Sequence, residues 1–373
     1  MKNKIFVLYI LLFSFFLCGA AFENDLVDKQ LSTLEKYENT SVLSEETKEI
    51  LSAIGIEEAD AEKILSFSLK DLIKLVWKSL TQKIKEPIKA IASVTAAVLI
   101  CSLIKNFCED FSAAGKIINF SAVIAVSCAI MLPLKNIMEY SAKVIEESSD
   151  FMLGFIPVYS SAAVSCGNVS SAVGYRTLML GTATAISQIS SEIVMPLISI
   201  YFAMCIAGSV SDLNIGEISK YFKNFSVWIL GASMTVFSGI LGLGTLISSS
   251  ADSSFNKTAK FLIGSAVPVV GGTISDALTT LKGCLSVTKN VFGIYGIIVT
   301  AAIFIPPIIS VISWKICLSA ASAVCGIAEN KELCGLLKSA SYVMGIMLAL
   351  LVSISIMFIF SVAVLLMAGG ALP

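Results

Sequence analysis

Residues 257–280 read KTAKFLIGSAVPVVGGTISDALTT, and the rest of the chain is interpreted around this stretch. It is apolar enough to enter a bilayer, yet it contains Pro268, the pair Gly271 and Gly272, and Asp276. Proline removes a backbone donor and paired glycines loosen the helical ladder, so carbonyl groups are freed that hydrocarbon cannot satisfy. We therefore expect a broken or re-entrant helix that is buried in protein or lines a wet cavity.

The composition indicates a membrane protein. Of the 373 residues, 56% are hydrophobic and 14% are charged, whereas a soluble globular chain carries about 25% charged residues. The expected fold class is therefore all-α, a polytopic integral membrane protein. A net charge of −1 argues against nucleic acid as a partner.

Catalytic and metal chemistry are poorly represented in the sequence. The chain has no histidine, which removes the commonest general acid–base residue and the commonest metal ligand. Its ten cysteines include no Cys-x-x-Cys pair, so neither a zinc site nor a disulfide framework is predicted. No P-loop is present. We expect no catalytic residue, no metal and no cofactor.

The N-terminus has the pattern of a secretory signal peptide over residues 1–21, with two early lysines, an apolar core and small residues at the end. An uncleaved anchor is the alternative. In either case the polar region 22–86 should lie outside the cytoplasm. Within it, Ser44 is predicted to cap a helix that ends before Gly55.

An amphipathic helix is predicted from residue 65 onward. Its apolar residues recur every three or four positions, which places them on one helical face. Two interpretations are open: this face lies on the outer membrane surface or a partner, or it packs on the protein's own membrane domain. The apolar residues are Leu69, Leu72, Val76, Leu80, Ile84 and Ile88.

The predicted membrane domain covers residues 87–373. A charged amphipathic linker is expected at 135–150, and the apolar segment 151–167 is interrupted by Gly154 and Pro157. Lysines are spread evenly over the loops, so the positive-inside rule gives no orientation and the topology rests on the signal peptide. The candidate spans are 88–104, 117–134, 177–190, 193–210, 225–247, 291–313, 316–327 and 342–369.

Two parts of this domain, about 117–210 and 225–313, resemble each other weakly. Paired Gly/Pro-broken segments in two halves of a membrane protein point to a central site or pathway. We therefore hypothesise that 151–167 and 261–280 are broken helices that meet near a pseudo-twofold axis. The matching residues are Phe151, Gly154 and Pro157 with Phe261, Gly264 and Pro268, and Pro196 with Pro307.

Asp276 is the most prominent charge in an apolar context. Carboxylates inside a membrane often mark ion or proton routes, and Lys260 or Lys282 would be its partner by proximity. The alternative is that Asp276 caps a helix at an aqueous edge.

The motif in 257–280 resembles the stage III sporulation protein AE family of endospore-forming bacteria. The likeness covers the layout of nearly the whole chain and is specific over about forty residues, from Lys257 to Gly293. The matching residues are Lys257, Lys260, Phe261, Gly264, Pro268, Val269, Val270, Gly271, Gly272, Ser275, Asp276, Ala277 and Thr280, followed by Val287, Lys289, Asn290 and Gly293.

This resemblance implies a non-enzymatic subunit of the channel complex that links mother cell and forespore, placed in the mother-cell membrane. The implied partners are other stage III A sporulation membrane proteins and the forespore stage II protein Q. Contact with membrane lipid is expected, and a homo-oligomer is left open. The alternative function is a stand-alone secondary transporter or exporter with a midplane site near Asp276.

Overall fold

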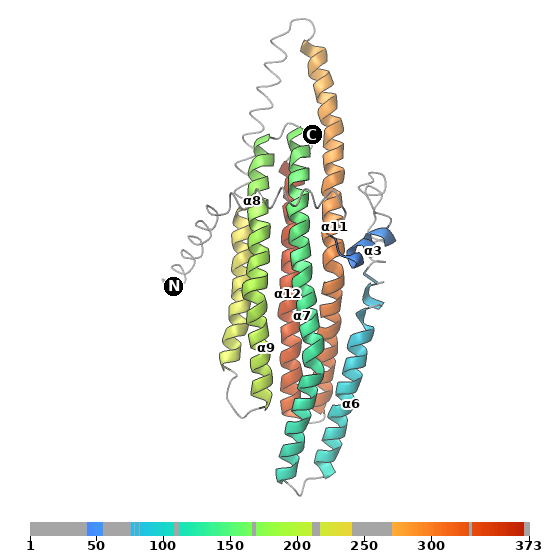
Figure 1. Ribbon diagram of the computed structural model, residues 1–373, viewed down its shortest axis with the longest axis vertical. Coiled ribbons are helices and arrows are strands. Elements are labelled where there is room, and N and C mark those ends of the chain that lie inside the picture. Colours follow the sequence, from blue (N-terminus) through green and yellow to red (C-terminus); the bar gives the residue numbers. More distant parts are fainter. Residues whose placement is uncertain are drawn as a thin grey trace, which may run out of the picture.

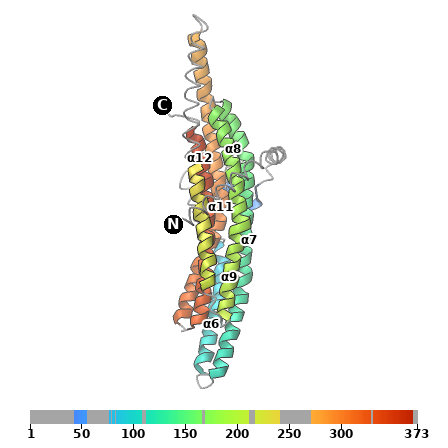
Figure 2. The ribbon, with the colours of Figure 1, turned by 90° about the vertical axis from the view of Figure 1, so that its left-hand side faces the viewer.

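The computed structural model describes residues 43–54, 76–77, 79–81, 83–107, 112–165, 169–210, 217–240, 271–327 and 330–368. Every regular element in these residues is a helix, which confirms the expected all-α fold class. The long helices run along one axis and form an elongated bundle (Figures 1 and 2). The signal peptide and residues 257–270 lie outside the described part.

The bundle is organised around α7, which contacts α6, α8, α9, α11 and α12, while α11 and α12 share the most extensive helix–helix interface. The order along the chain is α3 (Glu45–Ala53), α6 (Lys85–Phe107), α7 (Ser112–Ser165), α8 (Val169–Gln188), the π-helix η1 (Ile189–Val194), α9 (Met195–Val210), a helix over 217–240, α11 (Gly271–Ile327) and α12 (Lys331–Ala368).

The structure corrects the expected linker at 135–150 and the expected break at 151–167. Residues 112–165 form one continuous helix, α7, which includes Pro133 and Pro157. The middle of α7 remains helical because its charges fall on one exposed face while its apolar residues are buried on the other. The exposed residues are Lys135, Glu139, Lys143, Glu146 and Asp150, and the buried ones are Ile137, Met138, Val144 and Ile145.

Other expected segments are also joined. The spans 177–190 and 193–210 meet through η1, a wider helical turn placed where the sequence indicated a boundary. The spans 291–313 and 316–327 are one helix, α11, which continues through Pro306 and Pro307. Each proline removes one backbone hydrogen bond from the helix, and packing against neighbouring helices offsets this cost.

The bundle is longer than a membrane is thick. The 54 residues of α7 make a helix about 80 Å long, compared with a hydrocarbon core of about 30 Å. α7 therefore extends beyond the bilayer. Its charged middle face belongs outside the hydrocarbon, because a row of ionised side chains is costly in contact with lipid tails. The helices long and apolar enough to cross a membrane are found within Phe120–Ser160, Arg176–Ser209, Gly293–Ile327 and Lys331–Ala363.

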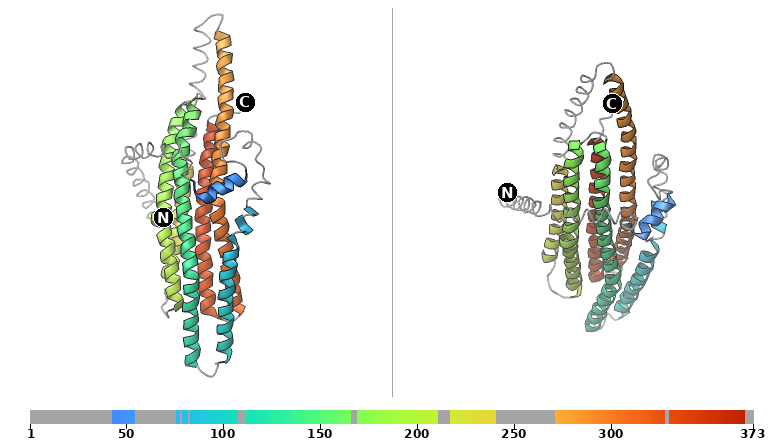
Figure 3. Two further views of the ribbon diagram at one scale, coloured as in Figure 1. Left: turned by 45° about the vertical axis from the view of Figure 1, so that its right-hand side comes forward. Right: turned by 45° about the horizontal axis from the view of Figure 1, so that its top comes forward.

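The N-terminal helix α3 lies across the outside of the bundle, near its middle (Figure 3). Ser44 caps α3 as predicted, since its side chain accepts a hydrogen bond from the Thr47 backbone nitrogen and the helix ends at Ala53. The amphipathic stripe is described only in part: Val76 and Ile88 are exposed, and Leu80 and Ile84 are half-buried.

An aromatic ladder on α7 fixes its approach to α11. The rings of Phe151 and Phe155 stack with centroids 5.4 Å apart, and those of Phe155 and Tyr159 with centroids 5.8 Å apart. The Phe155 ring lies directly over Gly296 of α11, where an added Cβ would come within 2.4 Å of the ring. Gly296 is therefore the contact that lets α7 and α11 pack closely.

We predict that Gly296→Ala destabilises the bundle. The new methyl group must displace the Phe155 ring, which is held by stacking on both sides, and such overpacking costs about 1–3 kcal/mol. Thermal unfolding of the purified protein in detergent measures the effect.

The matched control is Gly335→Ala on α12, where an added Cβ meets nothing within 4 Å, so its stability should be unchanged or slightly higher. Adding Phe155→Leu to Gly296→Ala should restore part of the loss. Equal unfolding temperatures for Gly296→Ala and Gly335→Ala would contradict the proposed close contact.

Candidate functional site

The predicted motif residues are only partly described. Gly271, Gly272, Ser275, Asp276 and Thr280 lie in the first turns of α11, for which the backbone is given. Figure 1 shows these turns reaching beyond the connection between α7 and α8. The other motif residues, Lys257, Lys260, Phe261, Gly264 and Pro268, fall outside the described part.

The residues of the first repeat that match the motif lie in α7, and this part of α7 contacts α11 far from Asp276. Phe151, Gly154 and Pro157 are buried in α7, and their neighbour Phe155 contacts Gly296. Asp276 precedes Gly296 by 20 positions on the same helix, which corresponds to about 30 Å. The described contacts therefore do not bring Asp276 to the Phe151 segment, and a site formed by both stays a prediction.

A polar contact between α3 and α7 is the most developed tertiary hydrogen-bond cluster in the described residues. Glu147 Oε1 accepts from the Ser44 backbone nitrogen at 2.9 Å and from Thr47 Oγ1 at 2.9 Å. The carboxylate thus lies at the N-terminus of α3, where free N–H groups and the helix dipole favour a negative charge. Glu147 acts as a helix cap supplied by a residue about 100 positions away.

A second group of contacts is made by Glu46, which lies in the same first turn of α3. Tyr140 donates its hydroxyl hydrogen to Glu46 Oε2 at 2.7 Å. Lys83 Nζ lies 2.8 Å from Glu46 Oε1 and 5.1 Å from the centre of the Tyr140 ring. These contacts join three parts of the chain: α3, the residues just before α6, and α7. We call the set formed by Ser44, Glu46, Thr47, Lys83, Tyr140 and Glu147 the α3 clasp.

Sequence reasoning missed the α3 clasp because residues 135–150 were interpreted as a linker. One signal was available: Tyr140 and Glu147 are seven positions apart, which places them on the same face of a helix, two turns apart. Their hydrogen-bond partners could not be found in the sequence, because these hydrogen bonds join residues separated by 94 to 103 positions.

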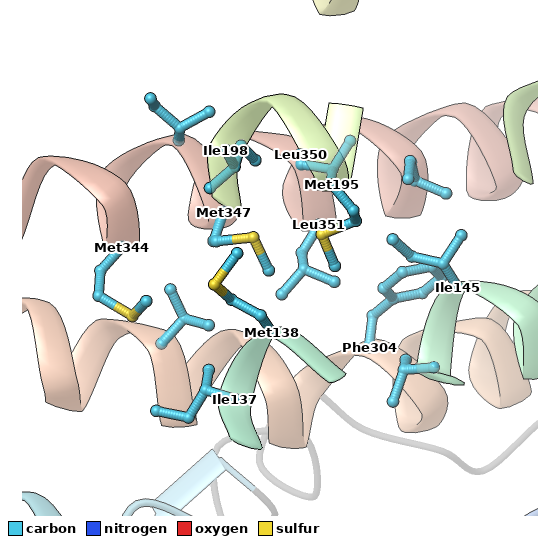
Figure 4. Close-up of a cluster of buried hydrophobic side chains, with 14 of the residues drawn as sticks. Ile137, Met138, Ile145, Met195, Ile198, Phe304, Met344, Met347, Leu350 and Leu351 are labelled. Atoms are coloured by element: carbon cyan, nitrogen blue, oxygen red, sulfur yellow. The ribbon is translucent and has the colours of Figure 1, made fainter. Parts of the chain in front are cut away.

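The centre of the bundle is filled with apolar side chains. Figure 4 shows residues from α7, α9, α11 and α12 meeting there, among them Met138, Met195, Met344 and Met347. Each of these methionines is at most 8% exposed. Flexible thioether side chains fill irregular gaps between helices, so this level of the described bundle is a packed core. Among the described residues no group of three His, Cys, Asp or Glu side chains could hold a metal ion.

Comparison with known proteins identifies the family. A family model described as stage III sporulation protein AE matches residues 56–369. The chain belongs to the stage III sporulation protein AE family. A curated relative, the stage III sporulation protein AE of Bacillus subtilis (strain 168), is 23% identical over 309 residues, which cover 82% of this chain and 77% of the relative. No solved structure matches the chain.

The family match confirms the resemblance seen in the motif and in the layout of the sequence. The match begins at residue 56, so it covers α6 to α12 and lies outside α3. The chain is thus a membrane protein of a family connected with sporulation, and the family description names no catalytic activity.

We predict that Glu147→Ala releases α3 from the bundle. The variant leaves the α3 N-terminus without its carboxylate partner, and hydrogen bonds to a charged group contribute about 1.5–3 kcal/mol. A loss of about 2 kcal/mol corresponds to a roughly 30-fold larger open population. Limited proteolysis of the N-terminal region should therefore be faster by about that factor.

Glu139→Ala is the matched control. It removes the same charge from the same helix, but Glu139 is exposed and pairs only with Lys135 at 3.4 Å in the described residues, so it should leave the cleavage rate unchanged. Tyr140→Phe should have an intermediate effect. If Glu147→Ala and Glu139→Ala are cleaved at one rate, the clasp does not hold α3.

Proposed function

We propose that this chain is a non-enzymatic membrane subunit of the multiprotein channel complex that links mother cell and forespore during endospore formation. The observation that carries the proposal is the family match over residues 56–369. The proposed location is the mother-cell membrane around the forespore. The proposed partners are other stage III A sporulation proteins and the forespore stage II protein Q, and contact with membrane lipid is part of the same proposal.

The shape of the bundle supports a role as a subunit that meets partners. The helices are longer than the bilayer is thick, so part of the bundle projects from the membrane. The projecting part carries a charged face on α7 and the N-terminal helix α3, which the clasp holds in place. A fixed polar surface outside the membrane is suited to protein partners. Because this surface is already ordered, binding does not incur the entropy cost of ordering it.

The packed centre bears on how such a subunit could serve a channel. At the level of Met138 and Met347 the described helices enclose mainly apolar side chains, packed against one another. A hydrated passage requires polar groups or open volume. We therefore place any conduit between this chain and its partners, or between copies of it, rather than through the centre of this bundle.

No observation in the described residues favours the alternative of a stand-alone secondary transporter. Such a carrier needs a midplane site, and Asp276 is the residue suggested for it. Asp276 lies in the first turns of α11, about 30 Å along the helix from Gly296, where α11 packs against α7. The two functions differ in what an uncharged residue at position 276 would do.

We predict that the tagged full-length chain, purified from sporulating cells, brings other stage III A sporulation proteins with it, as identified by mass spectrometry. Because the proposed role is structural, Asp276→Asn should leave both the co-purification and the spore yield within about twofold of the unaltered chain.

A different pair of results would overturn the proposal. These are purification of the chain without sporulation partners and solute uptake by liposomes that contain the chain alone and lose uptake with Asp276→Asn. The liposome assay uses the same purified protein, so both experiments can be read from one preparation.

A further inference from the structure

Lysines from two neighbouring helices reach one part of α12, which carries a third lysine of its own. Lys223 of the helix over 217–240 places its Nζ atom 4.3 Å from the centre of the Tyr342 ring. Lys315 of α11 places its Nζ atom 3.5 Å from where a Cβ on Gly345 would lie. Tyr342 and Gly345 are three positions apart, so they are neighbours on the surface of α12, and Lys338 lies one turn before Tyr342 on the same face.

These lysines carry positive charge that the described residues do not balance. The ion pairs formed in the described part of the chain involve Lys48, Lys83, Lys135 and Lys220. Lys223 and Lys315 are half-buried and have no carboxylate partner among these residues. Ammonium groups brought together out of bulk water repel one another, and a bound anion would remove this cost.

One exposed aromatic ring, that of Tyr342, lies beside Lys223, while other exposed aromatic residues lie on the opposite face of the helix over 217–240. On the helix over 217–240, Tyr221 is 75% exposed and Trp228 is 42% exposed, and the ring of Phe225 stacks on Trp228 with centroids 6.1 Å apart. Tyr342 on α12 is 48% exposed. An exposed tyrosine next to a lysine, here Tyr342 beside Lys223, is typical of the boundary between lipid tails and headgroups.

The height of the cluster along the bundle agrees with such a boundary. Figure 4 shows Met138 of α7 beside Met347 of α12, and Met347 follows Tyr342 by five positions and Gly345 by two. The cluster is therefore level with the start of the charged face of α7, which begins at Lys135. Two polar features on different sides of the bundle thus occur at the same height.

We propose that Lys223, Lys315 and Lys338 bind the phosphate group of an anionic phospholipid. The ammonium groups supply the charge that the phosphate requires, and Tyr342 supplies an aromatic surface in the same turn of α12. This lipid site uses residues separate from the α3 clasp and does not depend on the sporulation partners.

The test uses the full-length chain purified in mild detergent and stripped of lipid. Phosphatidylglycerol, phosphatidylcholine or inorganic phosphate is added, and the unfolding temperature is followed by tryptophan fluorescence. A ligand that binds the folded state raises this temperature. We expect phosphatidylglycerol to raise it by about 2 °C or more, and phosphatidylcholine and inorganic phosphate to leave it unchanged.

The variant Lys223→Gln with Lys315→Gln should lose the rise. The matched control is Lys220→Gln, which removes the same charge one turn earlier on the same helix, where Lys220 Nζ already pairs with Glu217 at 2.7 Å. It should keep the rise. If the double variant does not fold, Lys338→Gln, at an exposed position, is measured in the same way and should reduce the rise.

Three outcomes would overturn the proposal. One is a full rise in the double variant or, where that variant does not fold, in Lys338→Gln. Another is an equal loss in Lys220→Gln, which shows a general charge effect. The third is a rise with inorganic phosphate that matches the rise with phosphatidylglycerol, which assigns the lysines to a soluble anion instead of a lipid.

Discussion

The architecture depends on one constraint: the middle of α7 must be apolar on the face toward the bundle and charged on the opposite face. Toward the bundle it buries Ile137, Met138 and Ile145 against α9, α11 and α12. Toward the outside it presents a row of ionised side chains. Because both demands are met with helical spacing, the backbone needs no break between its two apolar runs. The continuity of α7 in turn sets the length of the bundle and the height at which α3 attaches.

Local features of this fold were accessible from the sequence, and non-local ones were not. Ser44 was predicted to cap a helix because a cap depends on residues three positions apart. The all-α membrane class followed from composition. By contrast, the charges at 135–150 were interpreted as an amphipathic linker because they interrupt an apolar run, and only the structure shows that this segment belongs to one continuous helix. Gly296 and Phe155 lie 141 positions apart, and no spacing rule connects them.

The candidate sites follow the same division. The motif over 257–280 was sufficient to indicate the family, which the match over residues 56–369 then confirmed. The α3 clasp and the lysine cluster could not be predicted, because each is assembled from helices far apart in the sequence. For the lysines the sequence was misleading, since they are evenly spread over the loops, and only the folding of three helices against one another concentrates them on α12.

The separation of Ser44 and Glu147 by 103 positions has a consequence for biogenesis. At a synthesis rate of about 5–20 residues per second, roughly 5–20 s pass between the emergence of the two residues from the ribosome. During that interval α3 exists without its distant carboxylate, and its N-terminal amides are free to bind other anions. Docking of α3 can thus occur only after α6 and the middle of α7 have been synthesised. The N-terminal helix is therefore one of the last parts of this half of the molecule to reach its final position.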